Sequence, residues 1–288
     1  PLVMDVMADH DIHVTFHLEP YSQDRVSRFP NDVLYLLRQY GERRRWDCFF
    51  LHERDDGSQG PLFKLFRTTL PQRLEDCHGV VQELPDYVPD SEWRREVDRL
   101  RETVIGDFDH LTLLSDTWDA ERVAAAGLDG ISVYDPVETS DRWLDHALVA
   151  SRMGMVFSFP INPGLDEIER RVVEPGSCYS PRPFLPRTSD LRWSRAADRE
   201  TARALAEQRT EETLQSNLLL QTHPWLGNVD KGFFLVHITS FNEWHEGHQY
   251  EPMKDGSALT LAERAIGYHN PEDGAYRLRH LADLLARL

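Results

Sequence analysis

The 288-residue chain has little lysine, little cysteine and no long apolar run. Only Lys64, Lys231 and Lys254 are lysines, and 49 acidic residues outnumber 32 basic ones, giving a formal charge of −17. This balance argues against nucleic acid and against an anionic membrane surface as partners, because phosphate binding needs a basic patch. No stretch approaches the ~20 apolar residues that cross a bilayer, so no membrane insertion is expected.

Several sequence signatures of other protein classes are also missing. Cys48, Cys77 and Cys178 are scattered without C-x-x-C spacing, so we expect neither a disulfide framework nor a zinc knuckle, and predict buried or incidental thiols. No glycine-rich phosphate loop follows the first predicted strand, which argues against an open dinucleotide-binding sheet. No G-x-S-x-G nucleophile elbow occurs.

Short apolar runs alternate with amphipathic helical patterns, which predicts a parallel α/β sheet. Six strands are expected, at residues 13–18, 62–66, 111–114, 130–134, 155–159 and 233–241. Helices are expected at residues 1–9, 31–40 with Asn31 as the N-cap, 91–105, 120–126, 139–153, 197–220 and 274–287. Polar residues end several strands, which suits a barrel better than an open sheet. Residues 160–195 are rich in proline and predict a long loop, either a wall of the site or a surface insertion.

The strand predicted at 233–241 ends in Asn242, Glu243, Trp244, His245 and Glu246. Carboxylates three residues apart face opposite sides of a strand but come together in a helical turn or tight loop. Two close carboxylates do not both ionise easily, so one can remain an acid at neutral pH. Paired acids beside an indole are typical of sugar chemistry. The alternative is two exposed loop carboxylates.

A metal site is a further hypothesis for this stretch. His245, Glu246 and His248 resemble the H-E-x-x-H zinc pattern, but the second histidine comes one residue early and follows a strand rather than lying on a helix. We therefore expect no metal and no cofactor.

A second polar strand end lies near the start of the chain, at His17, Glu19 and Tyr21. His17 and Glu19 are two residues apart and face the same way in a strand. A hydrogen-bonded structural pair and a ligand-binding pair are both compatible with this spacing.

At these residues the chain resembles glycoside hydrolase family 99, the endo-α-mannosidases. Residues 238–251 are similar to the family pattern I-T-S-F-N-E-W-H-E-G-T-Q-I-E, with His248 and Tyr250 in place of its second Thr and its second Ile. Residues 14–21 are similar to V-T-F-H-I-E-P-Y, and residues 128–134 supply a weaker third match.

The resemblance implies a (β/α)₈ barrel and a retaining glycosidase that cleaves α-mannosidic linkages in an oligosaccharide or polysaccharide. It implies that Glu246 is the general acid and then the base, and that Glu243 deprotonates the substrate 2-hydroxyl, which attacks C1 to form a 1,2-anhydro sugar. The residues implied to line the sugar subsites are His17, Glu19, Tyr21, Tyr134, Asn242, Trp244, His245 and Gln249.

The chain departs from the family pattern in three places. The six predicted strands correspond to strands three to eight, so residues 1–288 are expected to form a single barrel domain that is incomplete at its N-terminus. Residues 65–69 replace a Tyr-Asp-Ser-Tyr motif, and residues 175–186 do not match. These departures keep open an alternative function, a non-hydrolytic glycan-binding or polysaccharide-assembly module.

Overall fold

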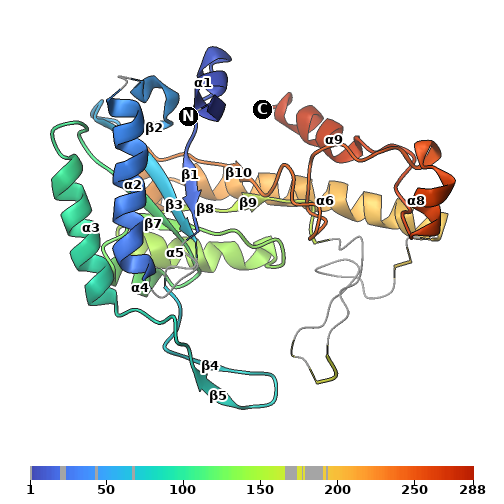
Figure 1. The fold of residues 1–288 in the computed structure, drawn as a ribbon, viewed down its shortest axis with the longest axis horizontal. Coiled ribbons are helices and arrows are strands. Elements are labelled where there is room, and N and C mark those ends of the chain that lie inside the picture. The colour runs from blue at the N-terminus through green and yellow to red at the C-terminus, as the bar shows by residue number, and fades with distance from the viewer. Residues whose placement is uncertain are drawn as a thin grey trace. The chain divides into compact units, whose positions relative to one another are not determined.

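The computed structural model describes residues 2–19, 24–42, 45–66, 69–165, 174–176, 178, 191–192 and 194–288 (Figure 1). The chain divides into two compact units. Unit 1 comprises Pro1–Val133, Asp145–Ser158 and Gln221–Phe234, and unit 2 comprises Tyr134–Leu144, Phe159–Leu220 and Leu235–Leu288. Each unit is described by itself below, and the single barrel domain expected from the sequence stays a prediction.

Unit 1 is built on a sheet in which the order β1–β3–β6–β7–β8 is parallel throughout and β2 pairs antiparallel with β3. The strands are β1 (Phe16–Leu18), β2 (Leu51–Glu53), β3 (Gln59–Phe66), β6 (Thr112–Asp116), β7 (Gly130–Ser132) and β8 (Val156–Ser158). Its helices are α1 (Leu2–Asp9), α2 (Arg25–Gly41), α3 (Asp90–Val104), α4 (Ala120–Ala125), α5 (Trp143–Arg152), whose first two residues are assigned to unit 2, and α7 (Gly227–Asp230). This alternation confirms the parallel α/β fold class predicted from the sequence.

Unit 1 also contains the 3₁₀ turn η1 (Trp46–Cys48) and the hairpin of β4 (Arg73–Glu75) with β5 (Val81–Glu83). The 3₁₀ turn η2 (Ser140–Arg142) belongs to unit 2. The sequence pattern did not predict the hairpin, because its strands are short and fully exposed and carry no alternating apolar residues.

Strand register separates an apolar face of the sheet from a more polar one. Phe16, Phe63 and Leu113 are partners across β1, β3 and β6, and the last two are fully buried. The next residues along the same strands, His17 and Lys64, are also partners and point to the opposite face. One face of the sheet therefore carries ionisable side chains beside the buried Leu62 and Leu114, while the other carries core residues such as Phe63 and Leu113.

Helices α2 and α3 bury apolar stripes that recur at helical spacing. Trp93, Val97, Leu100 and Val104 of α3 are all buried, as are Phe29, Val33, Leu37 and Tyr40 of α2. The rings of Phe29 and Trp93 meet with centroids 5.4 Å apart. Spacings of three and four residues place each stripe on one helix face, which is the pattern that predicted these helices.

The predicted N-cap of the second helix is wrong. Asn31 lies inside α2, which begins six residues earlier at Arg25, and its side-chain amide donates to the carbonyl of Ser27 at 3.0 Å. Pro30 also lies inside the helix. Because proline within a helix usually marks its first turn, the sequence pattern placed the start too late.

Unit 2 contains the short parallel pair β9 (Pro160–Ile161) and β10 (His237–Ile238), the long helix α6 (Ala196–Gln221), the turn η3 (Gly256–Ala258), and the helices α8 (Leu261–Ala265) and α9 (Tyr276–Leu285). Its core gathers Ile161, Leu214, Tyr250, Leu281 and Leu284. Strand β10 is much shorter than the predicted strand at 233–241. Within the described ranges, no helix combines the length and the apolar composition needed to cross a bilayer.

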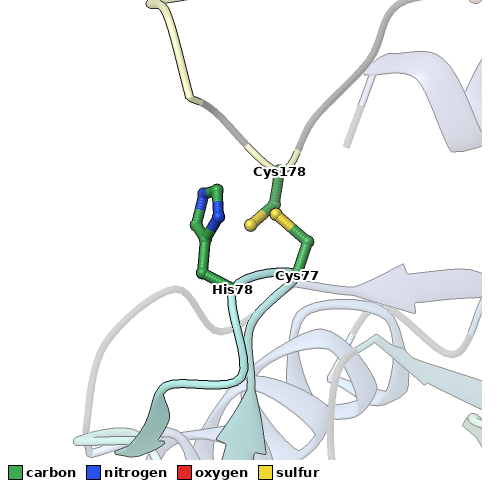
Figure 2. Close-up of side chains that lie close together, drawn as sticks. All are labelled: Cys77, His78 and Cys178. Atoms are coloured by element: carbon green, nitrogen blue, oxygen red, sulfur yellow. The ribbon is translucent and has the colours of Figure 1, made fainter.

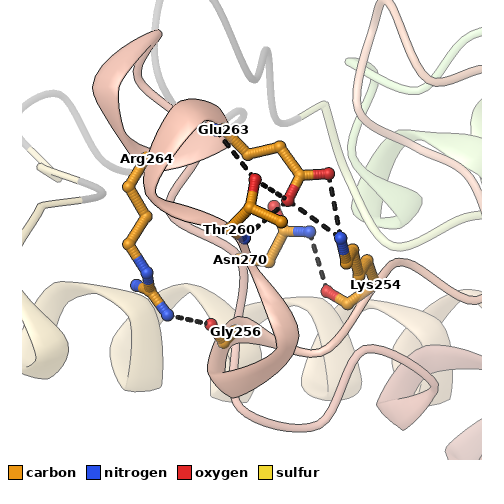
Figure 3. Close-up of polar contacts among 6 residues, drawn as sticks. All are labelled: Lys254, Gly256, Thr260, Glu263, Arg264 and Asn270. Atoms are coloured by element: carbon orange, nitrogen blue, oxygen red, sulfur yellow. Dashed lines mark hydrogen bonds and ion pairs between the residues drawn. The ribbon is translucent and has the colours of Figure 1, made fainter.

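Helix α8 is held by a polar network at its start (Figure 3). Thr260 and Glu263 form a capping box, and Lys254 Nζ donates to both carboxylate oxygens of Glu263, at 2.9 and 2.8 Å. The side-chain amide of Asn270 donates to the carbonyl of Lys254 at 2.8 Å, and Arg264 donates to the carbonyl of Gly256. Because α8 has no buried residues, these contacts rather than a packed face define it.

Candidate active site

The motif that follows β10 forms a loop whose two ends are hydrogen-bonded to each other. The amide of Thr239 continues the β9 pairing by donating to the carbonyl of Ile161 at 2.9 Å. The amide of Ser240 then donates to the carbonyl of His248 at 3.2 Å, and the amide of Tyr250 donates back to the carbonyl of Ser240 at 3.0 Å. Residues 240–250 therefore leave the strand and return to it as a closed loop, which we call the motif loop.

Glu243 and Glu246 lie on the tight turn of the motif loop. The amide of Glu243 donates to Ser240 Oγ at 3.0 Å, and the amide of Gly247 donates to the carbonyl of Trp244 at 3.2 Å. Gly247 has φ of +70°, a conformation that glycine adopts without a Cβ clash. Both glutamates are half-buried, whereas Trp244 between them is 50 % exposed. The turn expected from the sequence thus shelters the two carboxylates relative to the indole.

His248 binds the side chain of Glu246 directly. Its Nε2 lies 3.0 Å from Glu246 Oε2, and the imidazole is completely buried while the carboxylate side chain is 39 % exposed. The ring of Tyr134 meets the imidazole edge-on with centroids 5.6 Å apart. The sequence analysis considered His248 only as a metal ligand; the structure shows it as a partner of Glu246.

Arg277 holds the return strand of the motif loop from the first turn of α9. One guanidinium nitrogen, Nη1, donates to the carbonyl of Gly247 at 2.7 Å and to the carbonyl and side-chain oxygen of Gln249 at 3.1 and 3.3 Å. Arg277 is only 4 % exposed. Sequence analysis missed it, although an arginine in register with Leu281 and Leu284 on the apolar stripe of a helix is the signal that could have revealed it.

The other predicted residues of the loop differ in exposure. Asn242 and His245 are exposed, as is Trp244, and all three are accessible to a ligand. Gln249 is 1 % exposed, and its side-chain oxygen already accepts from Arg277. The roles of these four residues in substrate binding stay predictions.

The polar face of unit 1 carries a cluster of ionisable residues around His17. Lys64 is its partner on β3, and Asp116, at the end of β6, points to the same face. Burial, followed by the positive charge of Lys64, lowers the pKa of His17 to about 3. Its Nε2 lies 4.0 Å from Asp116 Oδ2, and because the ring is neutral this contact is not an ion pair at neutral pH.

Lys64 was not predicted as a site residue. Burial lowers the pKa of its ammonium group to about 8, and the carboxylate of Asp116, whose side chain is 6 % exposed, opposes that shift. The His17 ring also contacts Phe66 edge-on, with centroids 5.5 Å apart. The sequence offered a sign of this cluster, because Lys64 interrupts an otherwise apolar strand.

The first motif also supplied Glu19 and Tyr21 as predicted sugar-binding residues. Glu19 is exposed just beyond the end of β1. Tyr21 lies outside the described residues, as does most of the proline-rich segment 160–195. The alternative of a hydrogen-bonded His17–Glu19 pair stays a prediction.

A cavity of about 570 Å³ lies in unit 1 at the amino ends of β6, β7 and β8. Thr112, Asp129 and Val156, at or just before the starts of these strands, contribute to its lining. The polar face described above ends at the carboxyl side, where Asp116 closes β6. Active sites of α/β barrels lie at the carboxyl ends of the strands, so this cavity is not the candidate active site.

The expectation of buried or incidental thiols is wrong for two of the three cysteines. Cys77 and Cys178 are exposed and disulfide-bonded, and Figure 2 draws them with His78. Only Cys48 is a buried free thiol. Sequence spacing did not reveal the bond because its cysteines are a hundred residues apart, and only the fold determines which distant cysteines meet.

The hypothesis of metal binding at His245, Glu246 and His248 gains no support from the geometry. His248 and Glu246 are bonded to each other, and His245 is exposed. Among the described residues, the one group of three potential metal ligands is Cys77, His78 and Cys178. Because metal ligation requires thiolates, the oxidised pair does not offer these ligands.

The fold defined by these elements is that of known endo-α-mannosidases. Two solved structures of the GH99 endo-α-mannosidase from Bacteroides thetaiotaomicron superpose with TM-scores of 0.58 and 0.57 at 18 % sequence identity. The superpositions cover 99 % of this chain and 74 and 69 % of those chains. The structure thus has the α/β-barrel type of fold that the motifs implied.

Sequence comparison gives a consistent result. The chain is 21 % identical over 257 residues to the glycoprotein endo-α-1,2-mannosidase of Mus musculus, and 21 % identical over 270 residues to the glycoprotein endo-α-1,2-mannosidase-like protein of Homo sapiens. These matches cover 87 and 91 % of this chain, which spans about half the length of these relatives, 45 and 48 %. No family model matches. The resemblance to endo-α-mannosidases inferred from the motifs is confirmed.

Proposed function

We propose that this protein is a retaining glycoside hydrolase that cleaves α-mannosidic linkages in a glycan. The observation that carries the proposal is the motif loop, which holds Glu246 by a hydrogen bond from a buried histidine and shelters Glu243 three residues earlier. The similarity to endo-α-1,2-mannosidases supports the substrate class. The formal charge of −17 favours a neutral sugar over a polyanion such as nucleic acid.

In the proposed first step, Glu246 acts as the general acid. It protonates the glycosidic oxygen as the bond from C1 to that oxygen breaks. Glu243 removes the proton from the substrate 2-hydroxyl, and that oxygen attacks C1 from the opposite face. The product is a 1,2-anhydro sugar, with the leaving group released as an alcohol.

In the second step, water opens the 1,2-anhydro sugar. The carboxylate of Glu246 takes a proton from the water, whose oxygen bonds to C1 as the bond from C1 to O2 breaks. Glu243 returns its proton to O2. Two inversions at C1 give net retention, and both carboxyl groups regain their starting states.

The residues proposed to make polar contacts with sugar are those implied by the family resemblance. They are His17, Glu19, Tyr21, Tyr134, Asn242, His245 and Gln249. Trp244 offers a half-exposed indole face on which a sugar ring can stack. The neutral His17 ring supplies one donor and one acceptor at neutral pH, which matches a sugar hydroxyl.

Replacement of the proposed acid tests this function. In the 288-residue chain, Glu246→Gln is expected to lower the rate of mannan hydrolysis by about 10²–10⁴-fold, because a glutamine cannot donate a proton. Binding of α-mannobiose, measured by calorimetry, is expected to survive. Glu272→Gln, which changes an exposed glutamate in the same unit, is the matched control and should retain the parent rate.

Other outcomes would contradict the proposal. A Glu246→Gln variant that hydrolyses mannan at the parent rate removes Glu246 from the mechanism. Parent protein that binds α-mannobiose but releases no reducing sugar supports the glycan-binding module instead. Proton NMR of the first product formed should show the α-anomer; initial release of the β-anomer would exclude retention.

A further inference from the structure

The proposed mechanism assigns no function to the buried imidazole of His248, although this ring contacts the proposed acid Glu246. Its Nε2 contacts Glu246 Oε2 at 3.0 Å, whereas its Nδ1 is buried and has no hydrogen-bond partner among the described residues. The ring is fully buried beneath the motif loop, with the edge of the Tyr134 ring against it. The hydrogen bond of this buried imidazole is made to the proposed acid, so we infer that His248 does more than fill space in the core.

The surroundings select one form of this imidazole. A buried N–H without an acceptor costs more than a buried acceptor without a donor, so the proton resides on Nε2 and not on Nδ1. His248 therefore donates from Nε2 to the carboxylate of Glu246.

Arg277 contacts the backbone on both sides of His248. From α9 it donates to the carbonyls of Gly247 and Gln249. The same contacts fix the backbone that carries the imidazole. Among the described residues, Glu246 and Tyr134 are the titratable groups in contact with the ring.

We propose that His248 is a positioning residue that holds the carboxylate oxygen of Glu246 and sets the pH above which the protein loses its catalytic acid. The inference rests on the proposed function of Glu246. A hydrogen bond donated to the charged form of a carboxyl group favours that form. Consequently Glu246 gives up its proton at lower pH with His248 present than without it. The alkaline limb of the pH profile, where activity falls as Glu246 loses its proton, therefore lies at lower pH in the parent protein.

Two variants of similar size separate this role from a structural one. His248→Gln keeps an N–H donor near the position of Nε2, whereas His248→Leu fills the same buried space without a donor. The alkaline limb of kcat/KM on mannan is expected to move up by about one half to one pH unit in His248→Leu and to stay within about 0.3 unit of the parent in His248→Gln. His10→Leu, at an exposed histidine of unit 1, should leave the profile unchanged.

A second substrate tests the link to proton donation. An α-mannobioside with a 4-nitrophenyl leaving group needs little protonation of its departing oxygen, so His248→Leu should affect its kcat far less than that of mannan at the same high pH. A purely structural defect would depress both substrates alike. If His248→Leu fails to fold, His248→Asn replaces it, because its shorter amide does not reach Glu246 and the same upward shift is expected.

The results distinguish failure of this inference from failure of the proposed function. If the parent protein releases no sugar from mannan, the function itself fails. If the parent hydrolyses mannan and both His248→Leu and His248→Asn keep its alkaline limb, or if His248→Gln shifts the limb as far as they do, the role of His248 is overturned.

Discussion

At the scale of single residues, the structure shows how the environment changes side chains that the sequence presents as ordinary. His17 and Lys64 are strand partners on the polar face of unit 1, and the charge of Lys64 lowers the tendency of His17 to become protonated. The pKa of His17 falls to about 3 by burial and by the charge of Lys64. A group proposed to bind a sugar hydroxyl is thereby kept neutral over the whole physiological range.

Replacement of Lys64 should reveal this coupling. In Lys64→Met the pKa of His17 is expected to rise above 3, because the positive neighbour is gone, yet to remain below 6.5, because burial is the larger cause of the shift. Titration of the His17 ring protons by NMR measures the change. Lys231→Met, which removes an exposed lysine of the same unit, should leave the His17 titration where it is; an equal shift in both variants would assign the effect to net charge.

At the scale of elements, α8 depends on polar contacts more than on a buried apolar face, and polar contacts also close the motif loop. The motif loop is tied by its own backbone and by Arg277, and α8 by the capping box and Lys254. The contacts of Glu263, first those from Lys254 and then those from Thr260, lower the pKa of Glu263 from 4.5 to about 2. This local shift makes the stability of α8 depend on pH.

The sign of that dependence follows from linkage. Because the folded pKa of Glu263 lies below its unfolded value, its stabilising contribution is present above pH 4.5 and is lost as the pH falls toward 2. The urea midpoint of the parent should therefore exceed that of Glu263→Gln at pH 6, and the difference should shrink as the pH falls from 4.5 to 3. Glu272→Gln should show no such convergence, and a constant difference for Glu263→Gln would contradict the linkage.

At the scale of the whole molecule, the dominant property is a formal charge of −17. Like charges repel in the compact state, and salt screens that repulsion, with a screening length of about 10 Å at 0.1 M and about 3 Å at 1 M. The stability of the fold should therefore depend on ionic strength as a global quantity.

The melting temperature at pH 7 is expected to rise by about 2–6 °C between 0.05 and 0.5 M NaCl, as repulsion is screened. Thermal unfolding followed by circular dichroism measures it. The internal control is the same series near pH 5.1, the isoelectric point of the sequence, where the increase should nearly vanish. A melting temperature that falls with salt at pH 7 would show that ion pairs outweigh net repulsion.

Much of the fold could be predicted because local patterns carry it. The alternation of strands and helices follows from apolar periodicity, and helix α3, for example, shows its buried face at Trp93, Val97 and Leu100. The ends of helices and strands were less predictable than their presence. The last strand ends at Ile238, before the motif, since the backbone turns there to close the loop through Ser240 and His248.

The sequence by itself determined the class of fold, the resemblance to endo-α-mannosidases and the two glutamates proposed for catalysis, because these depend on spacing within short segments. Only the tertiary structure decided that His248 bonds Glu246, that Arg277 from α9 holds the loop, and that Lys64 faces the same side as His17. Two of these depend on residues from separate elements meeting at particular distances. The physical reason is that burial and hydrogen bonding are properties of surroundings, and surroundings are assembled only when distant parts of the chain pack together.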